Sequence, residues 1–217
     1  MVLRRGCPVV FLLGLMVAPA AFGQAKDSPV AFVNRDAILT TFIAAPNVGT
    51  QNSAGASGTP GQWLQVEFHY GTTATLKTAY LDAVEFKVWI EALDPMAINA
   101  QGGKGVGVAL TGSVTYINVA AGKDIYGVFY VHPSTVGRYG GDRGTEDFDR
   151  KYDVHIEAYV GGVLMDAINK NPNEKDPLVW FKPLTAIPNL VYRQDQCPFL
   201  VANPDRYPAI KLSAAAQ

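Results

Sequence analysis

Hydrophobic and polar residues alternate along much of the chain after residue 60. In residues 62–70, and again in residues 82–91, apolar side chains occupy every second position, and most positions between them carry Glu, Gln, Lys or His. Because successive side chains of a β-strand point to opposite faces of a sheet, both segments are predicted to be strands with one buried face. Their polar faces indicate a sheet that is covered on one side only, which favours antiparallel pairing.

Further segments rich in β-branched and aromatic residues follow at short intervals and are also predicted to be strands. These are residues 106–119, 124–132 and 153–160, with two shorter candidates at 178–181 and 189–192. Gly112 is expected to mark a bulge or a kink in the first of them. Residues 31–45 suit either a strand or a helix, and the lack of a helix-capping sequence favours the strand.

Two adjacent glycines at 161–162 separate two runs of strand-forming residues. Glycine adopts the positive φ angles of a two-residue hairpin turn without steric cost, so a β-hairpin is predicted here. Its expected register places Val160 opposite Val163 and Ala158 opposite Met165.

About seven strands with antiparallel turns and few helices predict an all-β fold, either a β-sandwich or a barrel. The alternating strands supply the two apolar faces that a sandwich requires. The preferred interpretation is therefore an antiparallel β-sandwich with an immunoglobulin-like topology. Prolines at 198, 204 and 208 exclude a regular helix after residue 196, so an extended C-terminal segment is expected. Four apolar side chains should hold this segment against the surface: Phe199, Leu200, Tyr207 and Ile210.

The first 23 residues have the features of a signal peptide. Arg4 and Arg5 precede an uncharged apolar run at 7–21, and small residues at its end suit signal peptidase, with the cut expected before Gln24. A membrane anchor is the alternative, but the run is interrupted by prolines and is shorter than the ~20 residues that span a bilayer. The expected organisation is a signal peptide (1–23), an N-terminal strand with a flexible Gly- and Ser-rich loop (24–61), and a β-sandwich domain with an extended C-terminal tail (62–217). The expected location is the periplasm, the cell surface or the medium.

Charge narrows the class of partner. The chain has 18 basic and 19 acidic residues, and removal of the signal peptide takes away two basic residues and no acidic ones. Nucleic acids and anionic membranes require clustered Lys and Arg, which a slightly acidic chain does not favour. Neither is expected as a partner, and no membrane insertion is expected after cleavage.

Cys7 leaves with the signal peptide, so Cys197 is the single cysteine of the expected mature chain. A lone thiol cannot form an internal disulfide, and the fold must depend on its apolar core. A buried, unreactive thiol is the preferred interpretation, and an intermolecular disulfide or a mixed-disulfide site is the alternative.

The sequence contains no recognisable catalytic, cofactor-binding or metal-binding motif. The histidines at 69, 132 and 155 lack the spacing of a helical or finger-type zinc site. His69 and His155 fall on polar strand faces, where a solvated side chain is expected. There is no nucleophile elbow, P-loop or dinucleotide fingerprint. The chain is therefore expected not to be an enzyme and to bind no cofactor.

Residues 138–153 form the most densely charged segment. Its carboxylates include Asp142, Asp147 and Asp149, and calcium prefers such oxygen ligands on a turn-rich loop. The segment lacks the regular spacing of known calcium loops, and its Arg and Lys residues neutralise most of the charge. A solvated loop with local ion pairs is the preferred interpretation. Calcium binding and sugar hydrolysis by paired carboxylates are the alternatives.

Two aromatic residues, Trp89 and Tyr159, occur on strand faces that otherwise carry Glu and Lys. An exposed aromatic side chain on a charged face can anchor a protein or a glycan, so these two residues form a candidate interface. The alternative is that a loop or the C-terminal segment covers them.

Four stretches together carry a family resemblance: WLQVEFHY (63–70), LDAVEFKVWIEA (81–92), ALTGSVTYINVAAGKDIYGVFYVHPSTVGRYGG (109–141) and EAYVGGVLMD (157–166). They resemble the pilus-like proteins that are encoded with type IV pilus machinery in Verrucomicrobia. The resemblance implies an immunoglobulin-like domain, a surface or periplasmic location, a role in pilus assembly or host contact, and no enzymatic residues. No prepilin leader precedes the expected mature chain, which fits an accessory protein better than a fibre subunit.

Two functions from different classes follow. The first is a non-catalytic exported binding or assembly protein, pilus-associated or adhesive. Its partners would be other proteins of a pilus or cell-surface assembly, or further copies of itself. The second is an extracellular ligand-binding or hydrolytic domain that uses the acidic loop at 138–153. An open patch of Trp and Tyr would favour the first function, and close carboxylates around a pocket would favour the second.

Overall fold

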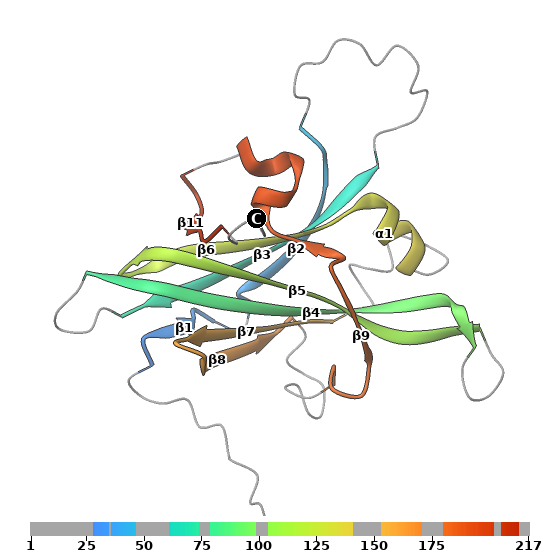
Figure 1. Ribbon diagram of the computed structural model, residues 1–217, viewed down its shortest axis with the longest axis horizontal. Helices are drawn as coiled ribbons and strands as arrows, with labels where there is room; N and C mark the ends of the chain where they lie inside the picture. The colour runs from blue at the N-terminus through green and yellow to red at the C-terminus, as the bar shows by residue number, and fades with distance from the viewer. Residues whose placement is uncertain are drawn as a thin grey trace, which may run out of the picture.

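The computed structural model describes residues 28–34, 36–46, 61–73, 79–98, 104–140, 153–170, 180–201 and 205–212. Within this part of the chain, the strands form two packed sheets (Figure 1). Three features expected from the sequence lie outside the described residues. They are the signal peptide (1–23), the loop at 47–60, and the carboxylates of Asp142, Asp147 and Asp149.

The first sheet has five strands in the order β1-β3-β6-β10, and β2 also pairs with β3. All of its pairs are antiparallel. Because β6 lies on one edge of β3, β1 and β2 lie one after the other on the opposite edge. The strands are β1 (Val30–Phe32), β2 (Ile38–Ala44), β3 (Gln62–Thr72), β6 (Gly122–Val131) and β10 (Val191–Tyr192).

The second sheet has six strands in the order β11-β5-β4-β7-β8, and β9 also pairs with β5. The β5–β9 pair is parallel, and the other pairs are antiparallel. The strands are β4 (Tyr80–Ile98), β5 (Lys104–Ala120), β7 (Val154–Val160), β8 (Val163–Asn169), β9 (Thr185–Pro188) and β11 (Ala209–Ile210).

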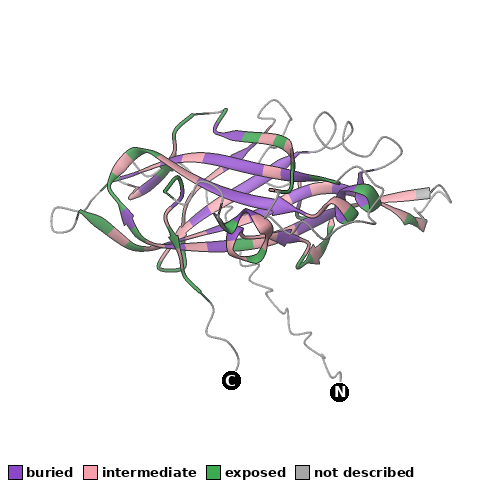
Figure 2. Ribbon diagram, turned by 90° about the horizontal axis from the view of Figure 1, so that it is seen from above, coloured by how far each residue is buried: buried purple, intermediate pink, exposed green. Residues whose placement is uncertain are grey.

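The core lies between the facing sides of the two sheets. Alternate residues of β3 and β6 point inward from the first sheet, and alternate residues of β4, β5 and β7 point inward from the second. Buried residues accordingly run along the strands, while exposed ones gather at turns and strand ends (Figure 2). Aromatic rings fill the centre, where Phe68 and Tyr70 of β3 each contact Phe86 of β4 at 4.7 Å between ring centroids. The period-two pattern of the sequence thus builds the core directly.

The predicted strands at 62–70, 82–91, 106–119, 124–132 and 153–160 are confirmed, as is the choice of strand for 31–45. The last of these segments is split into β1 and β2. The candidate at 189–192 is present as the short strand β10. The candidate at 178–181 is wrong for its described part, because residues 180 and 181 form a turn.

The hairpin at 161–162 is confirmed, with φ of 59° at Gly161 and 80° at Gly162. Val160 pairs with Val163 as predicted. Ala158 instead pairs with Asp166, because a β-bulge between Ala158 and Tyr159 shifts the register by one residue.

The bulge expected at Gly112 is absent. The pairing of Gly112 with Val88 lies within an unbroken run of β4–β5 pairs. An added Cβ would lie 2.8 Å from the carbonyl oxygen of Val191 in the opposite sheet. The glycine therefore permits a close approach between β5 and β10.

The expectation that the outer strand faces are solvated is wrong for the first sheet. Trp63 and Tyr130 lie on its outer side and are 8% and 3% exposed. Phe199 stacks on Tyr130 at 4.6 Å between ring centroids and meets Trp63 edge-on at 5.6 Å. A segment distant in sequence therefore covers this face, which the alternation within β3 could not indicate.

The C-terminal residues run over the surface in short elements. A 3-10 turn η2 (Gln194–Gln196) and a 3-10 helix η3 (Pro198–Val201) precede β11, which pairs with Ile117 and Tyr116 of β5. Phe199 and Tyr207 are buried as expected. Leu200 is 55% exposed, so its predicted contact with the surface is wrong.

The helix α1 (Pro133–Tyr139) was not expected from the sequence. Proline is well suited to the first turn of a helix, and the Nδ1 of His132 accepts a hydrogen bond from the Ser134 N–H over 3.1 Å. Among the described residues, no helix has the length and apolar composition needed to cross a membrane. The chain is an all-β sandwich, as predicted. The immunoglobulin-like topology stays a prediction.

Candidate binding crevice on the six-stranded sheet

The outer face of the second sheet brings the two predicted aromatic residues together on adjacent strands. The alternation of β4 points Lys87 and Trp89 outward, and that of β7 does the same for Glu157 and Tyr159. In the β4–β7 register, Lys87 pairs with Glu157, and Trp89 pairs with His155. This face therefore combines aromatic, acidic and basic side chains.

Trp89 is only partly exposed, because the turn before β9 packs against it. The ring of Phe181, in that turn, lies 4.6 Å from the indole between centroids, and the ring of His155 lies 5.5 Å away. These two contacts fix the position of the indole.

The prediction that His155 is solvated is wrong, because its side chain is fully buried. Phe181 stacks on the imidazole at 4.4 Å between centroids. The Nδ1 of His155 lies 2.6 Å from Asn169 Oδ1, and its Nε2 lies 3.4 Å from Glu157 Oε1. His69 is also partly covered, by a stacked Tyr126 at 4.6 Å. Both histidines are covered by residues outside their own strands.

Tyr159 belongs to the same polar network. Its hydroxyl donates a hydrogen bond to Glu157, and the ammonium of Lys87 lies 4.3 Å from the centroid of its ring. Burial raises the pKa of Tyr159, and the adjacent Glu157 carboxylate raises it further. Burial also acts to raise the pKa of Glu157, but the Tyr159 hydrogen bond and the nearby His155 and Lys87 side chains together outweigh it and lower that pKa below its usual 4.5.

A crevice of about 570 Å³ opens beside Trp89, between the outer face of β4–β5 and the segment that runs from β9 to η2. Two cationic residues line it, and none of its lining residues is acidic. Its polar and aromatic lining residues are Lys87, Trp89, Thr111, Ser113, Asn189, Tyr192, Arg193 and Gln196.

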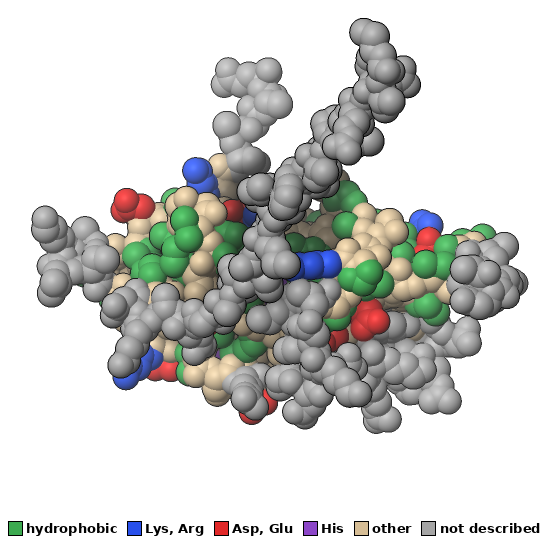
Figure 3. Space-filling model, turned by 90° about the horizontal axis from the view of Figure 1, so that it is seen from below, with side chains coloured by type: hydrophobic (Ala, Val, Ile, Leu, Met, Phe, Trp, Pro, Cys, Tyr) green, Lys and Arg blue, Asp and Glu red, His purple; other side chains and the backbone are tan. Residues whose placement is uncertain are grey.

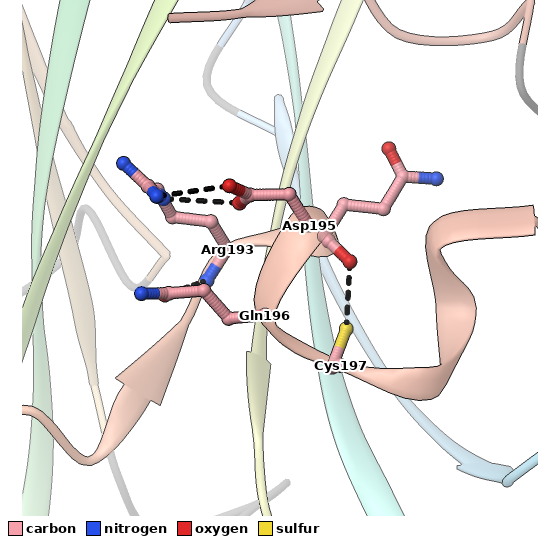
Figure 4. A network of polar contacts seen from close by, with 5 residues as sticks. Arg193, Asp195, Gln196 and Cys197 are labelled. Carbon is pink, nitrogen blue, oxygen red and sulfur yellow. Dashed lines mark hydrogen bonds and ion pairs between the residues drawn. The ribbon is translucent and has the colours of Figure 1, made fainter. Parts of the chain in front are cut away.

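Arg193 is held in place by its own segment (Figure 4). Its guanidinium donates to both carboxylate oxygens of Asp195, over 3.0 Å and 2.9 Å. Its backbone N–H donates to Gln196 Oε1 over 3.1 Å. In the same turn, the thiol of Cys197 donates to the carbonyl oxygen of Gln194 over 3.3 Å. One wall of the crevice is thus a small hydrogen-bonded unit.

Sequence reasoning identified Trp89 but missed most of the other lining residues. Arg193 and Gln196 lie more than 100 positions from Trp89 and reach it only because β9 pairs in parallel with β5. Nothing in the local composition of residues 185–196 indicated that pairing. Asn189 has a positive φ of 65°, a conformation that Asn adopts more readily than most residues, but this angle became known only from the structure.

Among the described residues, no group of three His, Cys, Asp or Glu side chains is placed to hold a metal ion. Seven large apolar side chains are exposed in the same residues, and neither Trp89 nor Tyr159 is one of them. Seen from below, hydrophobic side chains form separate patches among polar atoms (Figure 3). Because Trp89 and Tyr159 are both partly buried, the crevice beside Trp89 is the candidate binding site on the outer face of the second sheet.

Comparisons with known proteins address the family of the chain. A crystal structure of a protein from Akkermansia muciniphila, a member of the Verrucomicrobia, matches with a TM-score of 0.65 and 22% identity. The match covers 85% of this chain and 93% of the other, and at this identity it shows the shared fold. No curated protein matches the chain. A protein-family model, named only as “-like” and without an activity, matches residues 25–214 of this chain. Because that match spans most of the 217 residues, the chain belongs to this family.

Proposed function

We propose that this chain is a non-catalytic exported protein that binds other components of a cell-surface assembly, in a pilus-associated or adhesive role. The observation that carries the proposal is the outer face of β4, β5 and β7. There, Trp89 and Tyr159 lie among charged side chains next to an open crevice. Tyr and Trp are enriched in protein interfaces because they combine a large apolar area with a polar group.

Two further observations support the proposal. The sequence resembles pilus-like proteins of Verrucomicrobia, and the matching crystal structure is of a protein from that phylum. The predicted signal peptide supports export, because its basic residues, apolar run and terminal small residues form the usual order.

Fractionation of the producing bacterium tests the location. An immunoblot compares sheared surface filaments, periplasm, membranes and medium. Recovery with the filaments is the expected result, and an exclusively soluble pool with none on the filaments would contradict the pilus-associated role.

A pair of variants tests the proposed face. Tyr159→Ala removes an aromatic side chain from it, whereas Tyr80→Ala removes a Tyr that is 55% exposed near the start of β4. Both variants should fold, as thermal unfolding would verify. Tyr159→Ala should weaken recovery with the filaments, and Tyr80→Ala should not. Equal recovery of the two variants would show that the face around Tyr159 is not the interface.

A further inference from the structure

We propose that the crevice beside Trp89 binds an anionic saccharide, a sugar ring that carries a carboxylate or a sulfate. The proposal extends the binding role proposed above by naming a ligand for the same face. The volume of about 570 Å³ lies within the range of about 300–1,000 Å³ that small-molecule sites occupy.

Charge favours an anion. Lys87 and Arg193 both line the crevice, and its lining residues include no carboxylate. Asp195 uses two of the five N–H donors of the Arg193 guanidinium, and it holds the group in one orientation without lining the crevice itself. Glu85 lies 4.0 Å from the Lys87 ammonium and is also outside the lining. An anion in the crevice would therefore meet the remaining N–H donors of Arg193 and the Lys87 ammonium, which also lies 4.3 Å from the centroid of the Tyr159 ring.

The neutral polar groups favour a ligand with several hydroxyls. Thr111 and Ser113 lie side by side on the outer face of β5, and Asn189 lies on the opposite wall. These three side chains make no hydrogen bond within the described residues. Gln196 accepts from the Arg193 N–H through Oε1, which leaves its amide N–H groups to donate. Hydroxyls that donate and accept match this set better than a bare phosphate does.

The walls are already in place without a ligand. Trp89 offers apolar ring surface, and its contacts with Phe181 and His155 fix its position. Val191 pairs with Val131 in the first sheet and lies close to Gly112 of β5. These two contacts fix the backbone just before Arg193, which lines the second wall of the crevice. A preformed site avoids the entropy cost of ordering side chains on binding. A sugar ring could stack on the indole while its anionic group meets the cations.

Saturation-transfer NMR on residues 24–217 tests the proposal with matched sugars. D-glucuronate and D-glucose share a ring and differ in charge, and D-glucose 6-sulfate carries the alternative anion. Glucuronate or the sulfate should bind. The relative signals of these two sugars show whether the crevice prefers a carboxylate or a sulfate. Glucose should bind at least about tenfold more weakly, because a charge-assisted hydrogen bond is lost. Binding should also weaken as NaCl is raised.

Variants locate the site. Lys87→Gln should weaken binding of the anionic sugar by about tenfold, and Ser113→Val should weaken it through the loss of a hydroxyl. Lys123→Gln is the control, since Lys123 is exposed on β6 and does not line the crevice. Equal signals from glucose and both anionic sugars, or equal affinity of Lys87→Gln and Lys123→Gln, would overturn the proposal.

The sugar-binding experiment and the fractionation test the two proposals independently of each other. Recovery on filaments without sugar binding would overturn the crevice proposal alone. Sugar binding by a protein that is never found on filaments would overturn the pilus-associated role alone.

Discussion

Glu67 is a buried carboxylate on the outer side of β3 with three hydrogen-bond donors. Arg206 Nε and Nη2 donate to its two oxygens over 2.8 Å and 2.7 Å, and the Tyr207 hydroxyl donates over 2.7 Å. Burial acts to raise the pKa of this carboxyl, but the hydrogen bonds from Arg206 and Tyr207 and the charges of Arg206 and His69 outweigh it. The pKa of Glu67 therefore lies below its usual 4.5. The ionised form contributes stability above that pH, which is lost as the pH falls through the folded-state pKa.

Replacing Glu67 with Gln should lower the free energy of unfolding at pH 7 by about 1–3 kcal/mol, because charge-assisted hydrogen bonds are lost. Gln does not titrate, so the variant should also lose less stability than the wild type when the pH falls below 4.5. Urea unfolding at neutral and acidic pH measures both effects. Glu85→Gln, at a more exposed position on β4, should change stability by no more than about 0.5 kcal/mol. The explanation fails if Glu67→Gln and the wild type lose equal stability on acidification.

Cys197 should be a slowly reacting thiol. Burial raises its pKa to about 11, and the charge of Asp195 acts in the same direction. Because the thiolate is the nucleophile, alkylation by iodoacetamide at pH 8 should be about 100-fold slower in the folded protein than in urea. Mass spectrometry of the alkylated fraction against time measures this ratio. Similar rates in both states would point to a reactive thiol and would favour the intermolecular disulfide, which a non-reducing gel would detect.

At the residue scale, the sequence predicted inward-facing residues better than outward-facing ones. Phe68 and Phe86 are buried as their alternation indicated. Glu67 and His155 were expected in solvent, yet both are buried because Arg206, Tyr207 and Phe181 arrive from distant parts of the chain. A polar residue in an alternating strand identifies the outer face, but its exposure depends on what else the chain places there.

At the element scale, β3 and β6 fit together because a large residue on one strand lies opposite a small residue on the other. Phe68 pairs with Gly127, and an added Cβ at Gly127 would overlap the Phe68 ring. The glycine thus provides the space in which the ring packs against Phe86. The close fit of these two strands depends on the absence of a side chain at Gly127.

Gly127→Ala should destabilise the protein by about 1–3 kcal/mol, because the ring must leave its packed position. Gly137→Ala is the matched control, since Gly137 is exposed in α1 with nothing within 4 Å of an added Cβ. Alanine is the better helix former, so the control should be neutral or more stable by up to about 1 kcal/mol. Chemical denaturation measures both variants. If the two substitutions had the same effect, the packing explanation for Gly127 would be wrong.

Long alternating strands could be predicted as elements more closely than short ones, of which only β10 was expected, within the candidate at 189–192. β4 and β5 carry their pattern over many residues, but β9, β10 and β11 have four residues or fewer, which is too short for a period to appear. The bulge at Ala158–Tyr159 also has no local sign in the sequence. It moved the predicted partner of Ala158 by one residue, from Met165 to Asp166. The crevice depends on two of these short elements, since β9 and β10 carry its second wall.

At the scale of the whole molecule, the segment at 205–212 joins the two sheets. Arg206 and Tyr207 bind Glu67 on the first sheet, and Arg206 also lies 4.4 Å from the centroid of the Tyr126 ring. A few residues later, β11 pairs with the edge of β5 in the second sheet, and the Lys211 N–H donates to the Thr115 carbonyl oxygen. The same eight residues thus bury a polar face of one sheet and cover an edge of the other.

Deletion of residues 205–217 should therefore have two effects. The free energy of unfolding should fall by at least about 2 kcal/mol, because a buried Tyr and the hydrogen bonds to Glu67 are lost. The uncovered edge of β5 should also promote aggregation, since unpaired strand edges pair with other chains. Deletion of residues 213–217 is the control, because it leaves every contact named above in place. Urea unfolding and light scattering at rising concentration measure the two effects separately. Lower stability without aggregation would mean that β11 is not needed to protect β5, whereas equal behaviour of the two deletions would mean that this segment does not hold the sheets together.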